Sequence, residues 1–120
     1  MRASQELGRY GEDLAAAHVR AAGMRILARN WRCSGGELDV VAVDTDGCVV
    51  FIEVKTRRSA DFGTPVEAVT WQKARRIRRL ALRWLAEHPQ PGRRALRFDV
   101  ISVVRPHGGG VTVHHLRAAF

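Results

Sequence analysis

The sequence has few cysteines and no long apolar run, and both scarcities narrow the class of protein. Cys33 and Cys48 are too few for a disulfide scaffold, so we interpret both as reduced side chains. A zinc site that adds His114 and His115 is disfavoured, because only closely spaced ligand pairs are specific. The polar start of the chain lacks the apolar segment of a secretory signal, and no run of about 18 apolar residues could span a membrane. We expect a cytoplasmic protein without a membrane partner.

Acidic residues are also scarce relative to basic ones. The chain has 20 lysines and arginines against 12 acidic residues, a formal net charge of +8 and 46% apolar residues in 120. This length and apolar content suit a single domain over residues 1–120. A domain this basic suits a polyanion, so we expect a nucleic acid partner and favour DNA, although the sequence does not exclude RNA. The oligomeric state is not written in the sequence, and a homodimer stays open.

Apolar periodicity predicts two helices and five strands. One helix is expected over residues 5–22, capped by Ser4, and a second over residues 64–87, opened by a capping box at 64–67 and with a break near Thr70. Strands are expected over residues 24–32, 37–43, 48–56, 96–104 and 111–116. In the fourth strand, Asp99 is expected to pair with Arg97 or with an arginine of a neighbouring strand rather than to act in catalysis.

The second and third strands are predicted to form a hairpin. A three-residue loop at 45–47, with Gly47 in the left-handed conformation of a bulged turn, pairs Asp44 with Cys48. The opposing residue numbers in the two strands then sum to 92. This register decides which side chains meet across the hairpin.

In this register Asp39 lies opposite Glu53, and Glu37 lies opposite Lys55. Strand alternation places these four on one face, so we expect that face to carry chemistry at one end. The same face holds Val41, Val43, Val49 and Phe51, whereas the other, expected core face holds Leu38, Val40, Ala42, Val50, Ile52 and Val54.

Two facing carboxylates can share one divalent cation, and Mg²⁺ or Mn²⁺ suits the oxygen ligands of Asp39 and Glu53. Lys55, one of two lysines among eighteen arginines, can hold or deprotonate an attacking water. Glu37 is expected to pair with Lys55, with water-mediated contact to the metal as the alternative. A purely structural ion pair is the alternative for the whole constellation.

Six further elements of the sequence are informative in combination: Gly11-Glu12, Arg29-Asn30-Trp31-Arg32, Gly36-Glu37-Leu38-Asp39, Phe51-Ile52-Glu53-Val54-Lys55-Thr56-Arg57, Lys73 and Arg97-Phe98-Asp99-Val100. Together they resemble the bacterial YraN family within the restriction-endonuclease-like PD-(D/E)-x-K superfamily. The resemblance covers residues 8–105 and implies an α/β fold with an αβββαβ core, a mixed central sheet flanked by helices and an extra C-terminal strand. It also implies a metal on Asp39 and Glu53, Lys55 as the catalytic lysine and Glu12 as an accessory acid.

The second helix combines an apolar arc with a basic stripe. The arc is expected to be core, as is Trp31, and a base-stacking platform is the alternative for Trp31, Trp71 and Trp84. The stripe is interpreted as a track for phosphates, with a solvated face as the alternative. The arc comprises Trp71, Ala74, Ile77, Ala81, Trp84 and Leu85. The basic stripe comprises Gln72, Arg75, Arg76, Arg79 and Arg83. The other predicted nucleic-acid-binding residues are Arg57, Arg58 and Lys73.

We therefore predict a metal-dependent nuclease that hydrolyses phosphodiester bonds of DNA, with branched or single-stranded repair and recombination intermediates as candidate substrates. The alternative is a nucleic-acid-binding module that keeps the nuclease fold and does not cut. The complete set of Asp39, Glu53 and Lys55 favours the enzyme.

Overall fold

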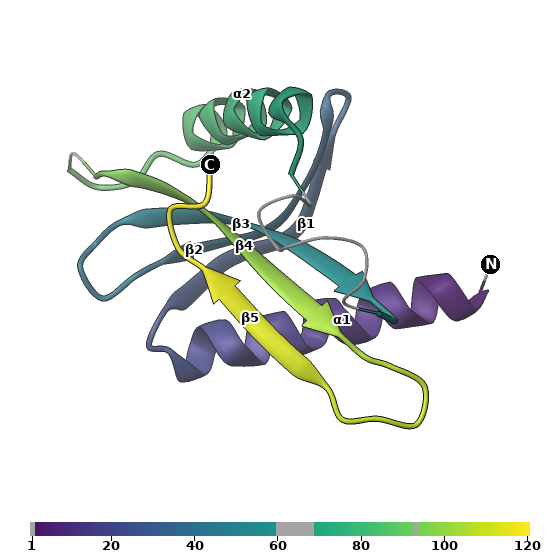
Figure 1. The fold of residues 1–120 in the computed structure, drawn as a ribbon. Coiled ribbons are helices and arrows are strands. Elements are labelled where there is room, and N and C mark those ends of the chain that lie inside the picture. The colour runs from purple at the N-terminus through teal and green to yellow at the C-terminus, as the bar shows by residue number, and fades with distance from the viewer. Residues whose placement is uncertain (1, 60–68, 93) are drawn as a thin grey trace.

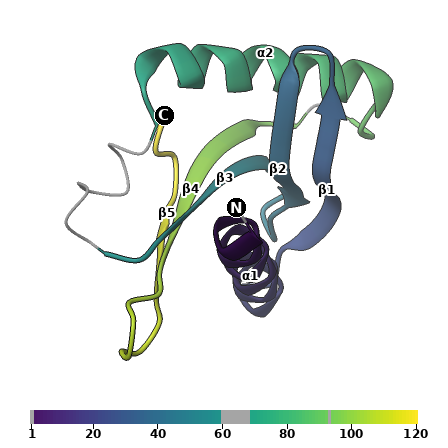
Figure 2. The same ribbon diagram turned by 90° about the vertical axis from the view of Figure 1, so that its right-hand side faces the viewer.

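The structure, a computed structural model, describes residues 2–59, 69–92 and 94–120. A five-stranded mixed sheet packs against one helix on each face (Figures 1 and 2). This is the predicted α/β arrangement with a C-terminal strand, and it is compatible with a restriction-endonuclease-like core. The elements are α1 (Arg2–Ala21), β1 (Arg25–Cys33), β2 (Gly36–Val43), β3 (Val49–Arg57), α2 (Trp71–Glu87), β4 (Leu96–Val104) and β5 (Thr112–Leu116).

The strands agree with their predicted bounds to within one residue at each end, whereas the helix starts differ. α1 begins at Arg2, so Ser4 lies inside the helix and is not its cap. α2 begins at Trp71 behind Thr70, whose side chain accepts a hydrogen bond from the Lys73 N–H at 3.2 Å. The predicted capping box at residues 64–67 lies outside the described residues. None of the helices in the described ranges is long and apolar enough to cross a membrane.

The sheet has the order β1-β2-β3-β4-β5. β3 and β4 run parallel, and the other three neighbouring pairs run antiparallel. A parallel pair requires a crossover connection, which α2 provides between the end of β3 and the start of β4. The predicted mixed sheet is therefore confirmed.

The predicted hairpin register is also confirmed. Its ladder pairs Val40 with Ile52 and ends at Val43 and Val49, so that opposing numbers sum to 92. Gly47 adopts a φ of +88°, the left-handed conformation that the turn requires. The turn closes through the backbone N–H of Asp44, which donates to the carbonyl of Cys48 at 2.9 Å.

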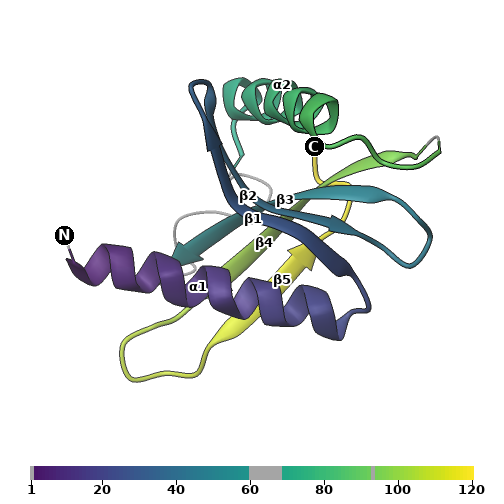
Figure 3. The same cartoon turned by 180° about the vertical axis from the view of Figure 1, so that it is seen from behind.

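The expectation of a single core face is wrong, because both faces of the hairpin are core. α1 covers the face of Val40 and Ile52, while α2 covers the face of Val41 and Phe51 (Figures 2 and 3). Helices on both faces protect a sheet whose strands are apolar throughout, as β3 is over its first four residues. The acidic side chains are therefore confined to the ends of these strands.

The N-terminal end of β2 diverges from β3, and the side chains there do not all lie on the faces predicted for them. The ladder between them ends at Val40, and residues 36–38 pair only with β1. The β1–β2 hairpin extends alongside α2 in this region (Figure 2). Leu38, predicted on the face of Val40, consequently packs in the core beneath α2. This divergence opens the space that the acidic side chains line.

α1 approaches the end of β3 very closely at Gly11. A Cβ atom on this residue would lie 1.8 Å from the Thr56 Oγ1 atom, so the helix could not keep its position with any larger residue. Glu12 is the next residue of the helix, and it is half-buried. The missing side chain of Gly11 thereby sets how closely the carboxylate of Glu12 approaches the sheet.

The buried arc of α2 differs from the predicted one. Ile77, Leu80 and Trp84 are buried against the sheet, with Ala81 beside them. Because Leu80 belongs to the buried arc, the centre of that arc lies further around the helix from Trp71 than predicted. Trp71 is accordingly 69% exposed. The prediction of Trp71 as core is therefore wrong. Trp84 is buried as expected, and Trp31 packs at the edge of the same core.

Candidate active site

Four carboxylates from three elements meet in one pocket of about 460 Å³. We call this group the acidic site; it consists of Glu12 from α1, Glu37 and Asp39 from β2, and Glu53 from β3. The basic side chains of Lys55, Lys73 and Arg76 line the same pocket, together with Gly36, Val54 and Ile77. The structure thus brings the predicted catalytic residues together.

Asp39 is the most perturbed member of the acidic site. Its Oδ2 atom accepts a hydrogen bond of 2.8 Å from the backbone N–H of Val54. Burial raises the pKa of Asp39 to about 9, helped by its hydrogen bond with Glu53 and by the negative charges of Glu53 and Glu12. Asp39 and Glu53 therefore meet as predicted, and they resist carrying two uncompensated charges.

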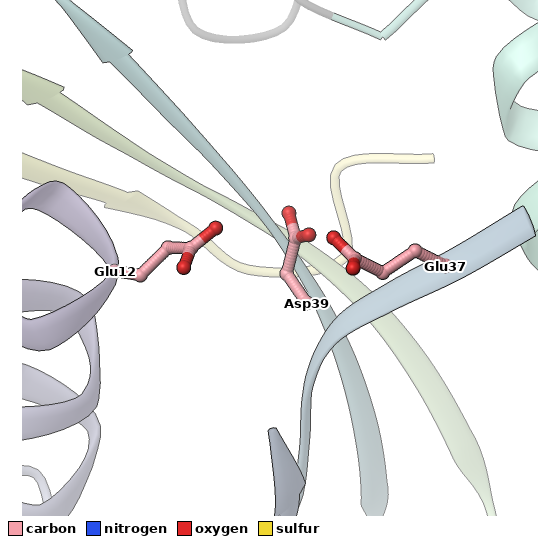
Figure 4. A group of neighbouring side chains, drawn as sticks. All are labelled: Glu12, Glu37 and Asp39. Atoms are coloured by element: carbon pink, nitrogen blue, oxygen red, sulfur yellow. The ribbon is translucent and has the colours of Figure 1, made fainter. Parts of the chain in front are cut away.

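Glu12 and Glu37 approach Asp39 from opposite sides (Figure 4). One oxygen from each of the three carboxylates lies within 4.8 Å of the others, which is a spacing compatible with a shared cation. Burial raises the pKa of Glu12, and the charge of Glu37 raises it further. The predicted accessory acid thus shares the electrostatic crowding of Asp39.

The predicted pair of Glu37 with Lys55 is wrong. Glu37 instead accepts a hydrogen bond from the Nε atom of Arg32, which lies opposite it across the β1–β2 hairpin. The β2–β3 ladder ends at Val40, so counting the register further along β2 gave a pairing that the backbone does not make. Lys55 lines the pocket as an exposed side chain, and no ion pair to it is formed within the described residues.

Lys73 approaches the acidic site from α2. Its Nζ atom lies 3.1 Å from Oε2 of Glu53, and the two side chains are 32% and 12% exposed. Lys73 falls at the edge of the predicted apolar arc, and from this position it can point toward the acidic site or snorkel at the edge of the core. Its contact with Glu53 crosses between elements and could not be derived from the pattern.

The predicted basic stripe lies exposed on α2, beside the acidic site. Gln72, Arg75 and Arg79 are exposed, and Arg76 connects this surface to the pocket. Arg83 is exposed as well, but it pairs with Glu87 at 3.1 Å and contacts Ser34. Arg57 and Arg58 are half-buried at the end of β3. These two arginines are therefore less exposed than those of the stripe.

A second charged group, which we call the Asp99 network, lies in the core next to α1. Asp99 is fully buried and accepts two hydrogen bonds from Arg97, at 2.9 and 3.0 Å. The predicted pairing with Arg97 is confirmed. His115, considered in the sequence as a zinc ligand, contacts Asp99 at 2.7 Å and His18 at 3.2 Å. Arg97 also donates to Asp44 at 2.8 Å.

The pKa values of the two aspartates in this network, Asp44 and Asp99, are lowered, whereas the pKa of Asp39 is raised. Burial alone would raise the pKa of Asp99, but hydrogen bonds from His115, Arg97 and the backbone outweigh burial and lower it. Burial likewise acts to raise the pKa of Asp44, and hydrogen bonds from Thr45 and Arg97 bring it below its usual value. The two groups of acids therefore have different physical roles.

Comparisons with known proteins place this chain among similar bacterial sequences. The model of the uncharacterised protein family UPF0102 matches residues 11–103. A UPF0102 protein of Parafrankia sp. (strain EAN1pec) is 59% identical over 120 residues, covering all of both chains. A UPF0102 protein of Nocardia farcinica is 55% identical over 116 residues, covering 97% of this chain and 90% of its own. The printed names of these relatives state no activity.

Proposed function

The chain belongs to the uncharacterised protein family UPF0102, and from the geometry of its acidic site we propose that it is a metal-dependent nuclease that hydrolyses phosphodiester bonds of DNA. One observation carries this proposal. Asp39 and Glu53 are in contact inside a pocket that two lysines and an arginine also line. Clustered acids with a strongly shifted pKa are typical of functional sites.

The donor atoms of the acidic site fit a divalent cation with a preference for oxygen ligands. Asp39 and Glu53 would hold it, because both carboxylates line the pocket. Glu12 would act as an accessory acid, since one of its oxygens lies within 4.8 Å of an oxygen of Asp39. A cation would also offset the repulsion that raises the pKa of Asp39. When bound, Mg²⁺ or Mn²⁺ would polarise the phosphate and lower the pKa of a water.

The two lysines have different partners and therefore different proposed roles. Lys55 makes no ion pair to a described residue, so its ammonium is available to orient or deprotonate the attacking water. Lys73 is bound to Glu53, and we assign it to positioning that carboxylate. The exposed Gln72, Arg75 and Arg79 bind phosphates at a distance from the scissile bond, and Arg76 does so at the pocket.

The test is a cleavage panel of linear duplex, single-stranded, flapped and four-way DNA and of structured RNA. Each substrate is incubated with Mg²⁺, Mn²⁺ or a chelator. We expect metal-dependent cleavage of DNA that Asp39→Asn abolishes. Asp13→Asn is the matched control, because Asp13 is an exposed acid on α1 that pairs with Arg29 at 2.8 Å outside the pocket. Binding without cleavage in every arm would contradict the nuclease and leave the non-catalytic nucleic-acid-binding module.

A further inference from the structure

The first turn of α2 presents an exposed aromatic ring. Trp71 is 69% exposed, more than any other large apolar side chain in the part of the chain that the structure describes. The guanidinium carbon of Arg75 lies 4.8 Å from the centre of the ring, a cation–π distance. An exposed tryptophan leaves a large, flat aromatic surface on which another flat group can stack.

Trp71 belongs to the same helical turn as Lys73, which lines the pocket of the acidic site. Lys73, two residues further along the helix, contacts Glu53 at 3.1 Å, so the first turn of α2 borders the pocket. Two residues of a helix are separated by about 3 Å along the axis and about 200° around it. A chain that leaves the pocket would therefore cross the start of α2 to reach Trp71. The first turn of α2 contains no acidic residue that would repel a phosphate there.

The side chains around the ring favour a nucleic acid as the partner. Gln72, Arg75 and Arg79 are exposed around Trp71, and the whole chain has a formal net charge of +8. An aromatic ring among guanidinium groups matches a strand that alternates flat bases with phosphates. An apolar protein surface would have to bury the cations that flank the ring, which is unfavourable. A base within a duplex stacks on its neighbours, so an added ring favours unpaired bases.

We propose that Trp71, backed by Arg75, is a stacking platform for an unpaired base of a DNA strand that enters the acidic site. The inference rests on the proposed function in taking the acidic site as the place of cleavage. It assigns the substrate class as single-stranded DNA, or branched DNA with an unpaired segment. Arg75 supports one side of the ring, and the base stacks on exposed aromatic surface.

The experiment measures binding of a single-stranded oligonucleotide and of a duplex of equal length, in chelator so that cleavage does not interfere. Trp71→Ala should weaken single-strand binding about 5- to 150-fold, the range for loss of one stacked base. Duplex binding should change by less than about twofold, because the platform adds nothing to a paired base. Leu82→Ala is the matched control, since Leu82 is 63% exposed on the same helix and has no ring. It should leave both affinities unchanged.

Fluorescence gives a second readout. Single-stranded DNA should quench tryptophan emission in the original protein, and Trp71→Phe should lose most of that quenching while it keeps most of the affinity. An equal loss for single strand and duplex in Trp71→Ala, or no loss, would overturn the platform. So would sedimentation that shows a dimer dissociated by Trp71→Ala without any change in DNA binding, because the ring would then be a contact between copies.

These outcomes are separable from failure of the proposed function. Asp39→Asn should abolish cleavage while preserving the preference for single-stranded DNA, since Asp39 lies in the pocket and not on the platform. A protein that binds through Trp71 but cuts no substrate would refute the nuclease alone. A protein that cuts single-stranded DNA equally well after Trp71→Ala would refute the platform alone.

Discussion

The raised pKa of Asp39 predicts that metal binding displaces a proton. With a pKa of about 9, the carboxyl of Asp39 is protonated in most metal-free molecules at pH 7. A metal ligand must be deprotonated, so each divalent ion bound at pH 7 should release about one proton. The apparent metal affinity should then rise about tenfold per pH unit between about pH 6 and 8.

Calorimetry in two buffers of different protonation enthalpy counts the protons that Mn²⁺ or Mg²⁺ releases. We expect a count near one at pH 7, falling toward zero above pH 9. Asp39→Asn should abolish both binding and release, and Asp13→Asn should change neither. Binding without proton release at pH 7 would refute the electrostatic argument, because Asp39 would then already be ionised in the metal-free pocket.

The same carboxyl predicts how metal-free stability depends on pH. Between about pH 4 and 9 the unfolded chain releases the Asp39 proton while the folded protein retains it, so the free energy of unfolding falls as pH rises. Relative to their difference at pH 4, Asp39→Asn should be more stable than the original protein by up to about 4 kcal/mol at pH 7. Urea unfolding at the two pH values measures this. A pH-independent difference would contradict it.

Three further perturbations test other parts of the argument. Lys55→Arg should retain DNA affinity but cut about 10²-fold or more slowly, because a guanidinium stays protonated; undiminished cleavage would remove its role at the water. Arg75→Ala combined with Arg79→Ala should flatten the logarithmic salt dependence of DNA binding by up to about two units, and an unchanged slope would identify a solvated face. Gly11→Ala should destabilise the fold by about 2 kcal/mol or more in urea unfolding, because its Cβ would meet Thr56, whereas Gly8→Ala, with open space around it, should stabilise α1 by up to about 1 kcal/mol.

The parts of the fold that could be predicted from the sequence are those in which local residue preferences fix the backbone conformation. Gly47 and the alternation along both strands give the hairpin register, and with it the meeting of Asp39 and Glu53. The second core could also have been identified. Val49 and Phe51 sit between apolar neighbours, so β3 is apolar on both faces, which is typical of a strand covered on both sides.

Contacts beyond regular pairing could not be predicted. Glu37 pairs with Arg32 because β2 leaves β3 at Val40, and strand curvature is not set by residue counting. Lys73 reaches Glu53 only because of where α2 lies over the sheet. Trp71 is exposed because α2 is oriented to bury Leu80, and this orientation depends on side-chain packing across the whole core.

Because the Asp99 network and the acidic site have pKa values shifted in opposite directions, the protein should respond to acid in two separate steps. Asp39 has a raised pKa, so it takes up its proton first as pH falls, while the protein remains folded. Asp44 and Asp99 have lowered pKa values, so the stability they contribute is present above about pH 4 and is lost only as pH falls through their folded values. Acid should therefore empty the acidic site of metal before it removes the stability that Asp44 and Asp99 contribute, so that loss of metal and loss of this stability become two events at different pH.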